Sequence, residues 1–248
     1  MGIHIGCSGW DYKHWQGLFY PEGSSSKSWF KEYSSVFSTV EINNTFYRLP
    51  APSVFGSWRE QAQPGFIYAV KASRFITHMK KLRDAGEPVR NFLDRARLLG
   101  DRLGPVLFQL PPHWGVNAGR LAGFISGLPG GFRYVFEFRD SSWYSGSIYD
   151  ILSAGKTSMC LHDMAGSESP IIPVGDICYI RFHGTSGKYA GGYPVSLLRG
   201  WIEFIRECVR QKKEVYVYFN NDAEARAPED ALRLIGALHD LYGEWKEK

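Results

Sequence analysis

The sequence predicts a (β/α)8 barrel, in which eight parallel strands close into an inner cylinder surrounded by helices. Two observations support this fold. Eight short runs of apolar, β-branched or aromatic residues recur along the chain, and most of the intervals between them have helical periodicity. A strand followed by a helix, repeated, implies parallel strands joined by right-handed crossovers. Eight units in 248 residues average about 31 residues each, close to the ~30 of one βαβ unit and to the total length of such barrels.

Each expected strand ends in polar residues or glycine, as buried strands bounded by turns do. The strands cover residues 3–8, 39–43, 66–72, 105–110, 134–139, 157–163, 177–184 and 215–221. Helices are expected over 88–103, 194–211 and 228–242, because apolar residues there would form one face that packs on a sheet. A doubly wound open sheet is the alternative, but the turn after the first strand lacks its glycine pattern. No linker divides the chain, so we expect one domain over residues 1–248.

Composition excludes several classes of protein. A hydrophobic fraction of 44% with 22% charged residues is typical of a folded globular domain and excludes wholesale disorder. The net charge of +4 is too small to indicate a nucleic-acid binder. The amino-terminal segment lacks the layout of a signal peptide, no apolar run approaches the ~18 residues of a membrane span, and the four cysteines form no CxxC pair. We therefore expect a cytoplasmic protein with no membrane partner.

Most of the expected strands end in a polar or ionisable side chain, and a barrel enzyme has its active site at that end. Strand side chains alternate, so residues two apart share a face. The strand-end candidates are Glu41, Asn43, Lys71, Gln109, Glu137, Arg139, His162, Arg181, His183, Asn220 and Asn221. Each buried polar group costs several kcal/mol if it is unpaired, so packing alone does not explain so many of them. The sequence predicts that they converge on one pocket, with Trp10 and Tyr12 nearby after the first strand.

We expect Glu41, Lys71, Glu137 and His183 to be the catalytic residues. Glu41 or Glu137 would act as a general base with a pKa raised by burial. Lys71 or His183 would supply an acid or an electrophile. Arg139 would hold a substrate carboxylate or phosphate, as would Arg181. The remaining candidates for substrate binding are Trp10, Tyr12, Asn43, Gln109, His162, Asn220 and Asn221.

Structural roles are an alternative for several of these residues. Glu137 and Arg139 could simply neutralise each other in the barrel mouth, and Glu41 could pair with Lys71. The two histidines could be interior residues with satisfied hydrogen bonds, and the two asparagines could cap the last strand. Trp10 could be only a plug at the mouth.

Seven segments of the chain resemble one known family. They are GCSGWDYKHWQGLFYP (6–21), VEINNTFYRLP (40–50), KASRFITHMKKL (71–82), LFQLPP (107–112), EFRDSSW (137–143), YIRFHG (179–184) and YFNN (218–221). Together they look like the YecE-like family, also called domain of unknown function 72, over essentially the whole chain. The resemblance implies a TIM barrel, and it implies no settled activity, because fold alone does not carry function.

The strand-end residues favour a metal-independent site. Glu41 and Glu137 are ligand types for a divalent ion, but Lys71, Arg139 and Arg181 on the same rim would repel one. We expect no metal and no cofactor. The function that fits is an enzyme of the hydrolase, lyase or isomerase class, acting on a small anionic sugar-like or polyol substrate by acid–base chemistry. The alternative is a nucleic-acid-binding or endonuclease-like barrel that uses an aromatic rim (Trp10, Tyr12, Trp15, Tyr47) and the basic segment 74–83.

Overall fold

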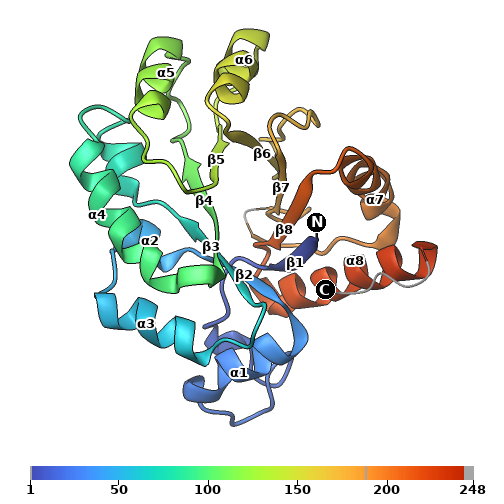
Figure 1. Cartoon of the computed structure of the whole chain (residues 1–248). Coiled ribbons are helices and arrows are strands. Elements are labelled where there is room, and N and C mark those ends of the chain that lie inside the picture. Colours follow the sequence, from blue (N-terminus) through green and yellow to red (C-terminus); the bar gives the residue numbers. More distant parts are fainter. Residues whose placement is uncertain (1, 188, 243–248) are drawn as a thin grey trace.

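Eight parallel strands close into a barrel with helices around it, as a computed structural model shows (Figure 1). The structure describes residues 2–187 and 189–242. The strands are β1 (Ile3–Cys7), β2 (Thr39–Ile42), β3 (Ile67–Lys71), β4 (Leu103–Gln109), β5 (Tyr134–Glu137), β6 (Ser158–Asp163), β7 (Ile177–Phe182) and β8 (Glu214–Phe219). Each strand pairs with the next along the chain, and β8 pairs with β1 to complete the closure. The barrel predicted from the sequence is confirmed.

Helices cover the outside of the barrel on nearly every side. They are α1 (Ser26–Val36), α2 (Asn44–Tyr47), α3 (Pro52–Gln61), α4 (Gly86–Ala96), α5 (Ala118–Ser126), α6 (Gly146–Ala154), α7 (Val195–Arg210) and α8 (Arg226–Tyr242). Single turns of 3-10 helix lie at Lys13–Trp15, Ser141–Trp143 and Ala223–Ala225, a longer one at Arg97–Arg102, and a π-helical turn at Phe75–Met79. The expected helix over 88–103 therefore divides into α4 and a 3-10 segment, within which Gly100 has a non-helical φ of +61°.

One crossover departs from the repeating pattern. Residues 164–176, between β6 and β7, form no helix. Pro170 and Pro173 lie in this segment, and each removes a backbone donor and clashes with the preceding helical turn. The connection therefore runs as an irregular loop on the barrel side where Figure 1 shows no covering helix.

The core has two parts that the barrel wall separates. The larger lies between the strands and the helices and is rich in aromatic rings. The smaller fills the barrel itself and consists of Ala69, Leu107, Val135, Cys160, Ile177, Tyr179, Tyr216 and Tyr218. Below it, at the amino ends of the strands, Glu214 pairs with Arg133 and with His4. The lower barrel is thus filled with side chains.

Gly6 allows β1 and β2 to approach closely. A Cβ at this position would lie 2.3 Å from the carbonyl oxygen of Thr39 and 2.7 Å from the hydroxyl of Tyr33. That hydroxyl accepts a hydrogen bond from the Cys7 amide at 2.7 Å and donates one to the Thr39 carbonyl at 2.9 Å. Tyr33 on α1 thereby joins the two strands beside their register pair of Cys7 and Val40.

No helix within the described ranges has the length and apolar character needed to cross a membrane. The cysteines Cys7, Cys160, Cys178 and Cys208 are all buried and unpaired.

Candidate active site

Two buried carboxylates share one buried guanidinium at the carboxyl end of the barrel. Arg181 on β7 donates from Nη2 to Oε1 of Glu41 at 2.8 Å and from Nη1 to Oε2 of Glu137 at 2.7 Å. These three side chains are at most 1% exposed. Glu137 is also bound by Arg139, and its Oε1 accepts a hydrogen bond from Nε2 of Gln109 at 3.0 Å. The four charges form an alternating chain inside the barrel, which offsets the cost of burying them.

Neighbouring side chains satisfy the oxygens of Glu41 and stabilise the ionised form of Glu137. Glu41 accepts from the Ser8 hydroxyl at 2.8 Å and from the Tyr179 hydroxyl at 2.5 Å, in addition to Arg181. Burial by itself would raise the pKa of Glu137, but Arg139 and Arg181 outweigh it and hold that pKa well below its usual range. The shift is opposite to the one expected of a general base raised by burial. Glu137 is therefore a charged anchor for two arginines.

Lys71 is the exception among the charged groups of the mouth. It ends β3 and is 8% exposed, and its Nζ has no hydrogen bond or ion pair among the described residues, although its carbonyl accepts from the Thr45 hydroxyl at 2.7 Å. Its Nζ lies 4.2 Å from the centre of the Phe46 ring. Burial is the largest influence on the pKa of Lys71 and the charge of Arg181 the next, and together they lower that pKa to about 7. The amine of Lys71 can thus give up or accept a proton near neutral pH.

Two histidines lie beside this cluster. Nε2 of His183 is 2.8 Å from Nη2 of Arg139, and Nδ1 of His183 is 3.0 Å from Nδ2 of Asn220. Burial, followed by the charges of Arg181 and Arg139, lowers the pKa of His183 well below its usual value, so the ring is neutral. The ring of His162 lies 6.4 Å from that of His183. Burial lowers the pKa of His162 to about 4.

Buried polar atoms without partners gather at this end of the barrel. Among the described residues five such atoms occur, and four of them belong to mouth residues: Nε of Arg139, Nε of Arg181, Nδ1 of His162 and Oδ1 of Asn43. Most buried polar groups in proteins find a partner, and exceptions call for an explanation. A ligand or ordered water in the mouth would satisfy these atoms. Their concentration makes the mouth the candidate site.

The structure brings most of the predicted site residues together. Contacts link Glu41, Gln109, Glu137, Arg139, Arg181, His183 and Asn220, with His162 against the ring of His183 and Lys71 within the electrostatic reach of both carboxylates. Tyr12 and Asn43 meet at the Ser8 carbonyl, at 2.7 and 3.3 Å, on the side of Glu41.

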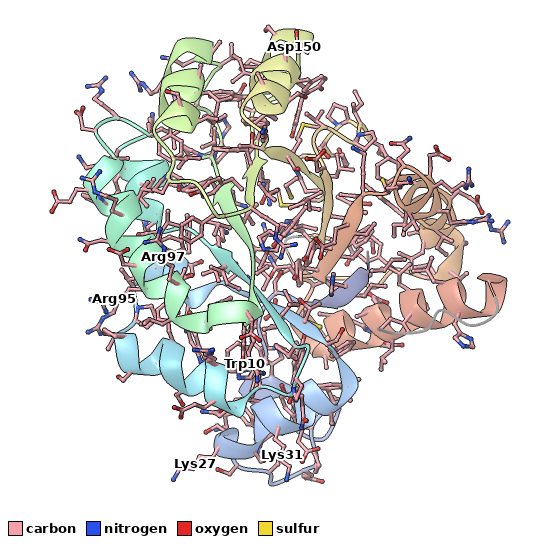
Figure 2. All side chains as sticks on the ribbon, viewed as in Figure 1. Trp10, Lys27, Lys31, Arg95, Arg97 and Asp150 are labelled. Atoms are coloured by element: carbon pink, nitrogen blue, oxygen red, sulfur yellow. The ribbon has the colours of Figure 1, made fainter. Side chains whose placement is uncertain are left out.

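Two predicted residues lie outside this group. Trp10 packs edge-on against Phe30 of α1 and Trp58 of α3, in the layer between barrel and helices (Figure 2). Asn221 donates to the Gly191 carbonyl and to Asp230 of α8, each at 2.8 Å. The strand alternation that turns Asn220 inward turns its neighbour outward.

Sequence reasoning missed four residues that shape the mouth. Tyr179 and Ser8 bind Glu41, Phe46 lies under Lys71, and the sulfur of Met164 accepts from Nη1 of Arg139 at 3.0 Å. The period of two along β7 could have identified Tyr179, which lies two positions before Arg181. Ser8 could have been identified as the polar end of the first strand. No sequence signal indicates the other two.

The carboxylate groups of the mouth, which are possible metal ligands, are bound by arginine side chains. In the described part of the chain no three His, Cys, Asp or Glu side chains group so that they could hold a metal ion. Each carboxylate oxygen of the pair already accepts at least one charged or hydroxyl donor.

Comparisons with known proteins identify relatives over almost the whole chain. Residues 4–247 match the family described as "Protein of unknown function DUF72". The "UPF0759 protein YecE" of Escherichia coli K12 is 29% identical over 252 residues, which cover 99% of this chain and 80% of that protein. The "UPF0759 protein YunF" of Bacillus subtilis is 25% identical, covering 97% of this chain and 96% of that one. The crystal structure of a DUF72 family protein from Thermotoga maritima superposes with a TM-score of 0.87 at 27% identity, covering 96% of this chain and 100% of that chain.

Proposed function

The chain belongs to the DUF72 family of proteins of unknown function, and from that premise we propose that it is a metal-independent enzyme that moves a proton on a small anionic sugar-like or polyol substrate at the barrel mouth. One observation carries the proposal: Lys71 is an enclosed amine without an ion-pair partner, among carboxylates and guanidinium groups that are all paired. A buried charge is normally paired, so an enclosed amine left without a partner fits a chemical role better than a structural one.

Lys71 is the proton carrier in this proposal. With a pKa of about 7, half of its molecules carry a free amine at neutral pH, which is the condition in which a general base is most effective. The neutral amine takes a proton from a carbon next to a carbonyl or from a hydroxyl of the substrate. The ammonium then returns that proton to another atom of the product, so Lys71 is regenerated.

The arginines stabilise the negative charge that appears when the proton leaves. Arg139 and Arg181 each keep an unpartnered Nε donor at the mouth, and fixed donors aimed at a developing oxyanion stabilise it without reorganisation. Glu41 and Glu137 hold these guanidinium groups in place. The expected roles are thereby exchanged: the lysine is the base, and the carboxylates are positioning residues.

The nucleic-acid alternative has weaker support from the aromatic residues. Trp15 is fully buried and donates from Nε1 to the Asp222 carbonyl at 3.0 Å, and Trp10 packs under α1 and α3. Of the four rings expected to stack bases, Tyr47 is exposed, at 72%. A base-stacking platform needs accessible ring faces, so a small substrate fits the mouth better.

Solvent-deuterium exchange tests the proposal directly. The protein is incubated in D2O with a panel of sugar phosphates, aldonic acids and polyol phosphates, and proton NMR follows exchange and conversion. We expect at least one compound to react, with a rate that rises as pH increases through about 7. Lys71→Met should lower this rate by about 10²-fold or more.

Lys31→Met is the matched control, because Lys31 is an exposed lysine on α1 (Figure 2), and it should retain the full rate. Exchange that persists in Lys71→Met would refute the role of the amine. Activity that disappears on adding EDTA would refute the metal-independent assignment. The absence of any reaction across the panel would contradict the proposed function itself.

A further inference from the structure

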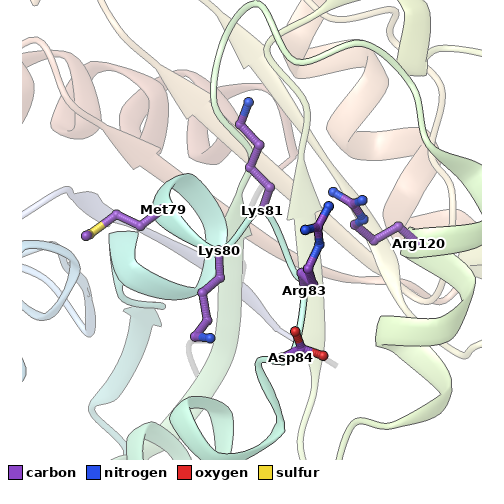
Figure 3. A pocket seen from close by; sticks show the side chains of 6 residues that line it. All are labelled: Met79, Lys80, Lys81, Arg83, Asp84 and Arg120. Carbon is purple, nitrogen blue, oxygen red and sulfur yellow. The ribbon is translucent and has the colours of Figure 1, made fainter.

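A basic cavity lies on the rim of the barrel mouth, outside the acid–base cluster. The cavity has a volume of about 290 Å³. It is lined by six residues (Figure 3): Met79, Lys80, Lys81, Arg83, Asp84 and Arg120. Five of the six belong to the loop between β3 and α4, and the sixth is on the first turn of α5. Both elements follow the carboxyl end of a strand, which is the end that carries Lys71.

The four cations of this cavity form no ion pair with any described residue. Within the described chain, none of Lys80, Lys81, Arg83 and Arg120 has a carboxylate within ion-pair distance, and Asp84 of the lining is unpaired as well. Elsewhere on the surface arginines are paired with glutamates one turn away, as on α7 and α8. Arg83 and Arg120 are both among the side chains that line this cavity (Figure 3). Two like charges held together are unfavourable unless an anion joins them.

Two of the cations lie near the ring of one aromatic residue, Trp114. The Nζ of Lys81 lies 6.0 Å from the ring of Trp114, and the guanidinium carbon of Arg120 lies 5.9 Å from it. Trp114 is itself 9% exposed and packs against Trp143. The two side chains therefore rest on a fixed surface, which reduces the entropy lost when they bind a ligand.

The backbone of this loop is strained. A π-helical turn over Phe75–Met79 precedes the cavity, and such turns are frequent at functional sites. Lys81, Leu82 and Asp84 then adopt left-handed φ values of +46°, +65° and +44°. Such values are unfavourable for residues other than glycine. Leu82 is buried and anchors the loop, which turns the side chains on either side of it outward.

The cavity is joined to Lys71 through two rings. The Phe46 ring lies 4.2 Å from Nζ of Lys71, and the ring of His78 packs edge-on against the same phenylalanine, with centroids 5.0 Å apart. His78 directly precedes Met79, the first lining residue of the cavity. The rim cavity and the acid–base cluster are thus connected through packed side chains.

We propose that this cavity binds the phosphate group of a small phosphorylated substrate whose reacting carbon lies at Lys71, an inference that rests on the proposed function and names its substrate class. Four cations and one carboxylate leave a net charge of 4 − 1 = +3 around the cavity, which suits a phosphate dianion better than a carboxylate. Guanidinium groups bind phosphate oxygens through paired hydrogen bonds. Within the mouth Arg139 and Arg181 are already paired with glutamates. The phosphate group therefore binds at the rim.

Calorimetric titration of ribose 5-phosphate, ribose and inorganic phosphate tests this inference. We expect ribose 5-phosphate and phosphate to bind and ribose to bind far more weakly. The double variant Arg83→Ala/Arg120→Ala should lower the affinity for ribose 5-phosphate and for phosphate about tenfold or more, since each charged hydrogen bond contributes a large share of the affinity. Arg90→Ala/Arg199→Ala is the matched control, because it removes the same charge from exposed positions outside the cavity, and it should bind as the wild type does.

Equal affinity in the two double variants would overturn the proposal, as would a wild-type protein that binds neither phosphate ligand. A single-stranded oligonucleotide that binds more tightly than ribose 5-phosphate, loses affinity in Arg83→Ala/Arg120→Ala and weakens steeply with salt would also overturn it, in favour of a nucleic-acid surface. Lys71→Met should retain the phosphate affinity of the wild type. Phosphate binding at the cavity without any proton exchange would refute the proposed function and leave the phosphate site standing.

Discussion

Arg181 allows a quantitative test of the buried charge network. Its guanidinium is shared by Glu41 and Glu137, at 2.8 and 2.7 Å, and is 1% exposed. Arg181→Met keeps the long side chain and removes the charge, so two buried carboxylates each lose a partner. Breaking a buried ion pair in this way costs about 3–5 kcal/mol. Domains are stable by about 5–15 kcal/mol, so we expect a folded variant with a much lower free energy of unfolding.

The cost should depend on pH in a defined direction. In the wild type the pKa of Glu137 is lowered, so its contribution to stability is present above the unfolded pKa of about 4.3 and is lost as pH falls below it. In the variant the carboxylate of Glu137 loses one neighbouring cation, so its pKa rises. Protonation of Glu137 at low pH then removes the poorly paired charge and restores part of the lost stability. The difference in stability between the two proteins should therefore be largest near pH 7 and shrink toward pH 4.

Urea unfolding at pH 7 and pH 4 measures both quantities. Arg210→Met is the control, because it breaks an exposed ion pair with Glu207 on α7 and should cost less than about 1 kcal/mol at either pH. If the free energy of unfolding of Arg181→Met lies within about 1 kcal/mol of the wild-type value at pH 7, the buried charge network does not stabilise the barrel. A difference that grows toward pH 4 would show that the sign of the Glu137 shift is wrong.

Three further outcomes follow from the contacts. The amine of Lys71 should titrate with a midpoint near 7 in NMR spectra, well below the ~10.4 of a lysine side chain in water; a midpoint above 9 would contradict the desolvated environment. Gly6→Ala should destabilise the barrel by about 1–3 kcal/mol in urea unfolding, because the new Cβ meets the Thr39 carbonyl at 2.3 Å, and an unchanged midpoint would show that the strands can separate freely. Glu214→Gln should lower stability at pH 7 and converge with the wild type as pH falls toward 2, since hydrogen bonds from His4 and Tyr216, followed by the charge of Arg133, outweigh burial and lower the pKa of Glu214 to about 2; a constant difference in thermal melts between pH 2 and 7 would refute the effect of these contacts.

Local pattern was enough to predict the architecture and the gathering of strand-end side chains at one end of the barrel. The eight runs ended where the strands end to within a few residues, and the polar residue at the end of most of them marked one face of the closed barrel. This works because strand alternation and the parallel direction of all strands are local properties that leave little freedom in where strand-end side chains can go.

Partner choice was decided only by the tertiary structure. Glu41 and Arg181 are 140 residues apart in sequence, and Glu137 and Arg181 are 44 apart, so no spacing in the chain could show that one arginine serves both carboxylates. That arrangement reverses the expected direction of the Glu137 pKa and leaves Lys71 as the group that titrates near neutrality.

The sequence by itself determined the fold, the strand ends and the set of chemical groups at the mouth, because these follow from periodicity and strand direction. The tertiary structure decided which of those groups are neutralised, which keep a free donor or a free amine, and that Trp10 belongs to the packed helical layer rather than to the mouth. The physical reason is that burial and charge pairing depend on distances between residues from different strands. Those distances are set only when the barrel closes, and they change a group's pKa and accessibility without changing its place in the sequence.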